Sequence, residues 1–174
     1  RAAGGDTLTT APQPDPRRAI IDLHTQLAGR GIALIVVPTP VKPTIHPERL
    51  SRRDAAARAV IANASYAPFV AELRSRGVLV FDAPAELAAL RQRTDAPAYL
   101  ATDTHWRPET VKYVADRLTA FIDATVDLPQ TDLVDYRVAT VEVSNDGDTM
   151  RLLDLPSRQS LYPPESVSVR QIRT

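Results

Sequence analysis

The strongest constraint on the fold is an uninterrupted apolar segment, Ile32–Val37, which lies between Gly31 and Pro38. Its residues are mostly β-branched or long aliphatic, a composition typical of a strand buried on both faces of a parallel sheet. Parallel strands need long crossover connections, which are usually helices. The segment therefore predicts an α/β fold in which helices cover both faces of the sheet.

The rest of the chain alternates between helical and strand patterns, as such a fold requires. A proline-rich loop, Pro38–Pro47, follows the first strand, and shorter apolar runs predict further strands at Val78–Phe81 and Tyr99–Ala101. We expect the three strands to be adjacent and parallel. Apolar residues at helical spacing, with Gly or Pro at the boundaries, predict helices over residues 17–28, 66–76, 84–93 and 108–123.

The patterns are weaker at the two ends of the chain. Residues 1–16 contain two glycines and three prolines without any period, so we expect an extended segment there and one domain over residues 17–174. Beyond Asp127 we expect strands at 138–143 and 166–172 and a short helix at 148–153, capped by Asp148. The chain starts with Arg1 and carries no signal-peptide pattern, which favours a piece of a longer protein.

Composition excludes several classes of function. Lys plus Arg (21) balance Asp plus Glu (21), so no overall positive field exists to hold nucleic acid. The chain has no cysteine, and its three histidines are scattered, which argues against disulfides, a thiolate nucleophile and a metal centre. No apolar run reaches the roughly 18 residues of a membrane span. We expect neither a metal nor another cofactor.

The clearest chemical signal is the pair Asp103 and His105, in a loop after a predicted strand. In open α/β sheets, reactive groups gather outside the carboxyl ends of the strands. Residues two apart in extended backbone project to the same side, so the carboxylate can accept a hydrogen bond from one imidazole nitrogen. The other nitrogen could then take a proton from a serine hydroxyl. The alternative is that Asp103 is a turn residue and His105 a bystander.

The surrounding residues resemble a known family. The segment Asp103-Thr104-His105-Trp106, followed by Pro108, resembles the Asp-x-His-Trp signature of the SGNH-hydrolase-like polysaccharide O-acetyltransferases of the alginate type, such as AlgJ and AlgX. Two weaker stretches agree: Val36–Lys42 resembles the family's strand ending in a Pro-x-Pro-x-Lys loop, and Gly147-Asp148 resembles its later Gly-Asp helix. The resemblance implies a flavodoxin-like three-layer sandwich with a parallel sheet and makes Asp103 and His105 members of a catalytic triad.

Two further residues are candidates for substrate binding. Lys42 could contact an acidic polysaccharide or an oxyanion from its loop, although a lone loop lysine is more often solvated. Trp106, the only tryptophan, could stack on a sugar ring beside His105 or serve as a packing residue. The family's tyrosine after the lysine loop is replaced here by His46, which leaves the role of that position open.

The serine nucleophile of the resemblance is missing. The family carries it in a Gly-Asp-Ser or Gly-Thr-Ser block after the Asp-His element, and no such block occurs in these residues. Thr149 follows Gly147-Asp148 and imitates the block, but the known threonine nucleophiles mostly rely on their own terminal amine. We therefore expect a fragment that is incomplete at its C-terminus and inactive alone. The downstream serines that we considered are Ser144, Ser157, Ser160, Ser166 and Ser168.

The resulting hypothesis is a piece of a polysaccharide O-acetyltransferase that works through an acetyl-serine intermediate, with His105 as base and Asp103 as the group that orients it. Two alternatives stay open: a carbohydrate esterase with water as acceptor, and a non-catalytic carbohydrate-binding or scaffold domain. The resemblance implies a polysaccharide acceptor, an acetyl donor and a membrane-bound acetyl-transfer partner. It also implies a periplasmic or cell-envelope location.

Overall fold

The computed structural model describes residues 15–49, 61, 63–129, 131, 134–154, 156 and 160–173. The extended segment expected at 1–16 lies outside these residues up to position 14. Asp15 is the N-cap of the first helix, where its carboxylate accepts the backbone N–H of Arg17 at 3.0 Å. Such a cap satisfies one of the free donors of the first helical turn.

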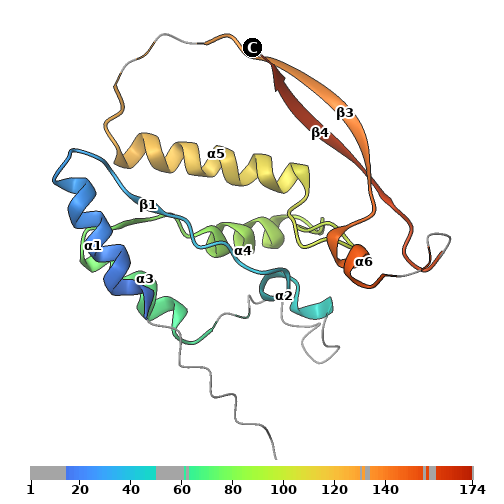
Figure 1. Cartoon of the computed structure of the whole chain (residues 1–174), viewed down its shortest axis with the longest axis horizontal. Helices are drawn as coiled ribbons and strands as arrows, with labels where there is room; N and C mark the ends of the chain where they lie inside the picture. Colours follow the sequence, from blue (N-terminus) through green and yellow to red (C-terminus); the bar gives the residue numbers. More distant parts are fainter. Residues whose placement is uncertain are drawn as a thin grey trace, which may run out of the picture.

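The elements alternate between helix and strand in the first half of the chain, and the second half contributes a long hairpin (Figure 1). In chain order they are α1 (Pro16–Ala28), β1 (Ile35–Val36), α2 (Lys42–Ile45), the 3-10 helix η1 (Pro47–Arg49), α3 (Tyr66–Ser75), β2 (Leu79–Val80), α4 (Ala83–Arg93), α5 (Pro108–Thr125), β3 (Arg137–Asn145), α6 (Asp148–Leu152) and β4 (Glu165–Arg173).

The first two strands form the predicted parallel pair, in which Ile35 lies opposite Leu79 and Val36 opposite Val80. Helices cover both faces of this pair. Ile35 packs against a core cluster that contains residues of α4 and α5, whereas Val36 packs against a cluster built from α1, α3 and β2. Successive strand residues point to opposite faces, so the sheet is the middle of three layers. The α/β class and the layered arrangement are confirmed.

The prediction of a third parallel strand at Tyr99–Ala101 is wrong. Tyr99 forms only an isolated antiparallel bridge with Trp106. The neighbouring backbone groups are also occupied, because Leu100 N–H donates to the His105 carbonyl at 3.1 Å and Arg107 N–H donates to the Ala98 carbonyl at 3.0 Å. The segment thus folds back on itself, and its hydrogen bonds close the loop that carries Asp103 instead of extending the sheet.

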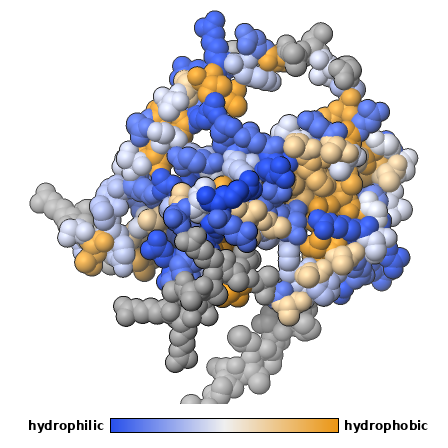
Figure 2. Space-filling model, turned by 180° about the vertical axis from the view of Figure 1, so that it is seen from behind, coloured by the Kyte–Doolittle hydropathy of each residue, from blue (hydrophilic) through white to orange (hydrophobic). Residues whose placement is uncertain are grey.

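The segment Ile32–Val37 is also less buried than its composition predicts. Ile35 and Val36 are half-buried, and Ile32 and Val37 are 49% and 36% exposed. Figure 2 shows the molecule from behind, with hydrophobic residues reaching the surface in patches between hydrophilic areas. Among the described residues β1 pairs with β2 alone, which leaves its other edge without a neighbouring strand. A buried central strand would need partners on both sides.

The two strands expected near the C-terminus form the antiparallel hairpin β3–β4, paired from Arg137 opposite Arg173 to Asn145 opposite Glu165. In Figure 1 this hairpin arches away from α5, and α6 lies beside its base, near the loop that precedes α5. The hairpin therefore brings a distant part of the sequence to the Asp103–Trp106 loop. In the described part of the chain, no helix is long and apolar enough to cross a membrane.

Candidate active site

The loop between α4 and α5 presents Asp103 and His105 in different environments. The Asp103 side chain is buried, whereas the His105 side chain is 77% exposed. The two side chains converge as predicted: His105 Nδ1 lies 2.6 Å from Asp103 Oδ1, and the His105 backbone N–H donates to the same oxygen at 2.9 Å. With Nδ1–H donating to the carboxylate, Nε2 of the neutral ring is left as the free base.

Asp103 accepts four hydrogen bonds and is thereby fixed in place. Besides the two from His105, Asn145 Nδ2 donates to Asp103 Oδ2 at 3.0 Å and the Asp148 backbone N–H donates to it at 3.2 Å. Burial alone would raise the pKa of Asp103, but the hydrogen bonds from Asn145, His105 and Asp148 together hold this pKa well below its usual range. The group is a carboxylate at any physiological pH.

The hydrogen bond from His105 to Asp103 and the charge of that carboxylate raise the pKa of the His105 imidazole above its ordinary value. The charge of Asp148 adds to this effect and that of Arg151 opposes it. A carboxylate that holds Nδ1–H in this way favours the imidazolium that forms when Nε2 accepts a proton. The geometry is that of a general base with its orienting group.

The turn at Gly147 brings the hairpin end of the chain against this loop. Gly147 has a φ of +81°, and a Cβ there would lie 2.1 Å from the Thr102 carbonyl oxygen. Only glycine combines this backbone conformation with so close an approach. The Thr102 hydroxyl also donates to the Asp146 carbonyl at 3.3 Å. From the sequence, the Gly-Asp pair was expected to begin a short helix and was weighed only as an imitation of the nucleophile block, not as a contact of the Asp103 loop.

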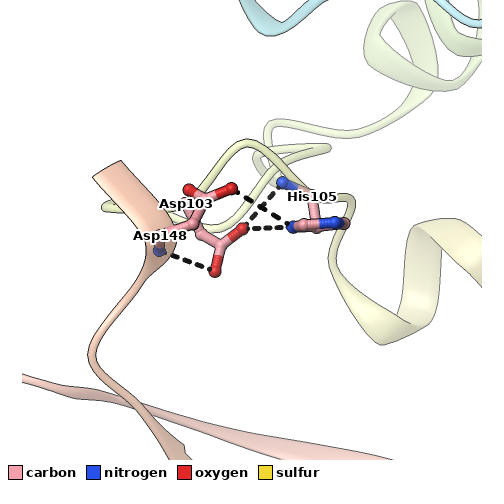
Figure 3. A group of neighbouring side chains, drawn as sticks. All are labelled: Asp103, His105 and Asp148. Atoms are coloured by element: carbon pink, nitrogen blue, oxygen red, sulfur yellow. Dashed lines mark hydrogen bonds and ion pairs between the residues drawn. The ribbon is translucent and has the colours of Figure 1, made fainter. Parts of the chain in front are cut away.

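Asp148 is not the plain helix cap that the sequence predicts. The N-cap of α6 is Gly147, and the Asp148 carboxylate instead accepts the backbone N–H of Thr104 at 2.8 Å and the Thr104 hydroxyl. Its Oδ2 also lies 3.5 Å from His105 Nδ1. Figure 3 shows Asp103, His105 and Asp148 as one group, with Asp148 approaching from α6. The contact with a loop 44 residues earlier takes the carboxylate away from its own helix.

Lys42 lies at the site but is not free to bind a ligand in this structure. Its ammonium group donates to the carbonyl oxygens of Leu100, Ala101 and Asp103 at 2.5, 2.9 and 3.1 Å. An ammonium group has three donors, so all are in use. Burial lowers the pKa of Lys42, an effect that the charge of Asp103 opposes. These contacts join α2 to the Asp103 loop, and a role for Lys42 in substrate binding stays a prediction.

Trp106 has a packing contact and also lies at a cavity. Its ring packs edge-on against Tyr99, with 6.4 Å between ring centroids. It also lines a cavity of about 1000 Å³ that His105 and Asp103 border. The walls of this cavity come from α5 and from β3 and β4, and Val111 of α5 is half exposed and faces it. A role for Trp106 in substrate binding stays a proposal.

His46, at the position of the family's tyrosine, is a buried structural residue. Its Nε2 accepts the Ala98 backbone N–H at 3.0 Å, and its Nδ1 lies 3.0 Å from Glu48 Oε1. Burial lowers the pKa of His46, against the hydrogen bond to Glu48. The neutral ring, with Nδ1–H donating to Glu48, satisfies both contacts. His46 therefore holds the start of the Asp103 loop.

The described residues offer His105 no nucleophile. Within this part of the chain, the hydrogen bonds that His105 donates come from Nδ1 and the backbone N–H, and Nε2 has no hydroxyl partner. The Thr149 hydroxyl donates to Asp148 Oδ1 at 3.3 Å. Among the serine candidates, Ser144 lines the cavity, Ser166 and Ser168 donate to Glu142 on the hairpin, Ser160 is exposed, and Ser157 lies outside the described residues.

Asp103, His105 and Asp148 also have the spacing of a possible cation site, since one ligand atom from each lies within 4.8 Å of the others. Every carboxylate oxygen of this group already accepts a hydrogen bond from the protein. A cation would have to displace these donors. The arrangement fits a histidine held by carboxylates better than a shared ligand set.

Comparison with known proteins finds relatives of this chain. The family model described as the SGNH hydrolase-like domain of the acetyltransferase AlgX matches residues 5–174. The probable alginate O-acetylase AlgJ of Pseudomonas aeruginosa is 36% identical over 153 residues, which cover 85% of this chain and 37% of that protein. The chain thus spans little more than a third of this curated relative.

Two solved structures share the fold. The O-acetyltransferase domain of Pseudomonas putida AlgJ superposes with a TM-score of 0.67 and 20% identity, over 94% of this chain and 59% of that one. Pseudomonas aeruginosa AlgX superposes with a TM-score of 0.68 and 20% identity, over 94% of this chain and 38% of that one. The α/β fold predicted from sequence is therefore of the SGNH-hydrolase-like type.

Proposed function

Because this chain belongs to the family of SGNH hydrolase-like domains of the acetyltransferase AlgX, we propose that it contributes the Asp-His half of a Ser-His-Asp triad to a polysaccharide O-acetyltransferase. The observation that carries the proposal is the 2.6 Å contact between His105 Nδ1 and a fully hydrogen-bonded Asp103, with Nε2 left open. The curated relative is a probable alginate O-acetylase, which makes an acidic polysaccharide the acceptor that we propose.

The reaction follows from the roles of these groups. His105 Nε2 takes the proton of a serine hydroxyl while that oxygen attacks the acetyl carbonyl of the donor, and the imidazolium then returns the proton to the leaving group. In the second half, His105 takes the proton of an acceptor hydroxyl, whose oxygen attacks the acetyl-serine, and returns it to serine. Asp103 orients the ring and stabilises the imidazolium in both halves.

We propose that the serine belongs to a part of the whole protein that these 174 residues do not include. The chain spans 37% of its curated relative, and no hydroxyl of the described residues reaches Nε2. The same relationship supports a periplasmic or cell-envelope location and a membrane-bound partner that supplies acetyl groups. Trp106, on the wall of the cavity beside His105, is the residue that we propose for stacking on a sugar ring.

The test compares the 174-residue chain with a longer protein that carries this domain, using an activated acetyl ester as donor. We expect no turnover by the chain alone, turnover by the longer protein, and its loss in His105→Ala. Asp146→Asn, which changes an exposed carboxylate nearby, is the matched control and should keep full activity. Turnover by the chain alone that disappears in Thr149→Ala would make the Gly147-Asp148-Thr149 turn the nucleophile block.

An assay with an oligosaccharide acceptor distinguishes the transferase from the esterase and from a non-catalytic binding domain. With oligosaccharide present, appearance of acetylated sugar identifies a transferase, and release of acetate alone identifies the esterase alternative. Binding of oligosaccharide by the longer protein without any turnover would identify a non-catalytic binding domain and overturn the proposal.

A further inference from the structure

The Asp148 carboxylate makes contacts that the triad does not require. One of its oxygens accepts the backbone N–H of Thr104 at 2.8 Å, and the other accepts the Thr104 hydroxyl and lies 3.5 Å from His105 Nδ1. The Asp148 backbone N–H donates to Asp103 Oδ2 at 3.2 Å. One residue of α6 thus touches three consecutive residues of the loop.

The backbone conformation at Gly147 places Asp148 against the Asp103 loop. A glycine with φ of +81° and no room for a Cβ against Thr102 turns the backbone so that the first residue of α6 faces the loop. The Asp148 side chain is 27% exposed, far less than the 77% of His105 beside it. The contacts with Thr104 lower the pKa of Asp148, so it is negatively charged at neutral pH.

We infer that Asp148 is a positioning residue of the proposed active site, a second carboxylate that holds the loop at Thr104 and shares with Asp103 the stabilisation of a positively charged His105. Asp103 accepts four hydrogen bonds, which spread its charge over several donors and leave less of it for the imidazolium. A second negative charge 3.5 Å from Nδ1 compensates for this. The role in catalysis rests on the proposed function.

Other charged groups lie near His105, and a measurement of its pKa must separate their effects from the effect of Asp148. On α6, Arg151 acts against the imidazolium while Asp148 favours it. From α5, Glu109 and Lys112 line the same cavity as His105, and Lys112 is paired with Asp116. A titration of His105 therefore reports mainly on Asp103 and Asp148, with Arg151 as the opposing charge.

The test is a pH titration of the His105 ring by NMR in the 174-residue chain, which needs no catalytic activity. Asp148→Asn keeps the size of the side chain and its acceptor for the Thr104 N–H but removes the charge. We expect it to lower the pKa of His105 while Nδ1–H stays bonded to Asp103. Asp146→Asn removes a carboxylate two residues away and should leave the titration unchanged. Equal titration curves for these two variants, in chains with intact amide spectra, would overturn the inference.

A second variant separates charge from loop geometry. Thr104→Val removes the hydroxyl that the Asp148 carboxylate binds but keeps the charge next to His105. The pKa of His105 should then stay as in the unmodified chain or rise, because the carboxylate is freer to pair with the ring. A fall like that in Asp148→Asn would show that the effect comes from the shape of the loop, which would overturn the electrostatic role even if Asp148→Asn failed to fold.

Activity adds a readout that distinguishes the inference from the proposed function. In the longer protein, Asp148→Asn should reduce kcat/KM about fivefold to tenfold, the factor expected for one unit charge at this distance in a water-like environment. The acidic limb of the pH profile should move to lower pH with the pKa of His105. If the unmodified longer protein transfers no acetyl group, the proposed function fails, whereas the His105 titration still decides the role of Asp148.

Discussion

Lys42→Met tests whether the lysine of the proline-rich loop is a structural residue or a ligand contact. Methionine keeps most of the apolar length of the lysine stem and removes the ammonium group. Three carbonyl oxygens, at 2.5, 2.9 and 3.1 Å from Nζ, would then lose their common donor. Since they belong to residues 100, 101 and 103, the loss falls on the backbone that carries Asp103 and His105.

The magnitude follows from these contacts. A hydrogen bond to a charged group contributes about 1.5–3 kcal/mol, and the three bonds here share one partly exposed ammonium group, so their energies do not add fully. We expect Lys42→Met to lower the free energy of unfolding by about 2–4 kcal/mol. Urea denaturation followed by circular dichroism measures this difference, and the NMR signals of His105 report whether the loop has moved.

The chain offers a matched control in its other lysine, Lys112, which is exposed on α5 and paired with Asp116 four residues later. An exposed pair of this kind contributes about 0.3–0.5 kcal/mol, so Lys112→Met should change stability little. If Lys42→Met destabilises the chain no more than Lys112→Met and leaves the His105 signals in place, the structural role of Lys42 is refuted, and the substrate contact expected from sequence becomes the better account.

The other predictions concern the same loop. Gly147→Ala should destabilise the chain by about 2 kcal/mol or more, because a φ of +81° strains any side chain and the new methyl group would overlap Thr102; an unchanged urea midpoint would contradict this. His46→Phe should cost about 1–3 kcal/mol by leaving a buried backbone N–H without its acceptor, which the same denaturation experiment measures. The lowered pKa of Asp103 contributes stability that is present above its ordinary value of 3.8 and is lost as the pH falls through its folded value. The raised pKa of His105 contributes stability that is present below 6.5 and is lost as the pH rises through its folded value. Stability from this pair should therefore be greatest between about pH 4 and 6.5, and Asp103→Asn should flatten the profile.

The features that could be predicted from the sequence are those that depend on residues close together in the chain. The run Ile32–Val37 located β1, and the apolar spacing from Pro108 onward located α5 to within two residues at its end. The pair Asp103 and His105 could be recognised because the two residues are neighbours, and their side chains meet as expected. In each case the signal and the structure lie within a short stretch of chain.

Contacts between distant parts of the sequence were missed. Asn145 donates to Asp103 from 42 residues away, and Glu165 accepts the Ala101 backbone N–H across 64 residues. Nothing in the local pattern marks either residue. The contacts of Lys42 were missed for a similar reason, because the sequence does not show that three carbonyl groups of a later loop converge on one point. The false strand at Tyr99–Ala101 arose because its apolar composition does not reveal that residues 105–107 take its hydrogen bonds.

The contacts that fix Asp103 have a consequence for how the chain folds. Its donors on β3 and α6 lie 42 and 45 residues away, and the lysine that binds its carbonyl lies 61 residues away in the other direction. Each contact closes a long loop, whose entropic cost is met only once much of the domain has formed. The Asp-Thr-His-Trp tetrapeptide transplanted onto another scaffold would carry the chemical groups without these distant donors. We therefore expect the Asp103–His105 geometry to form late in folding, because it depends on the domain as a whole.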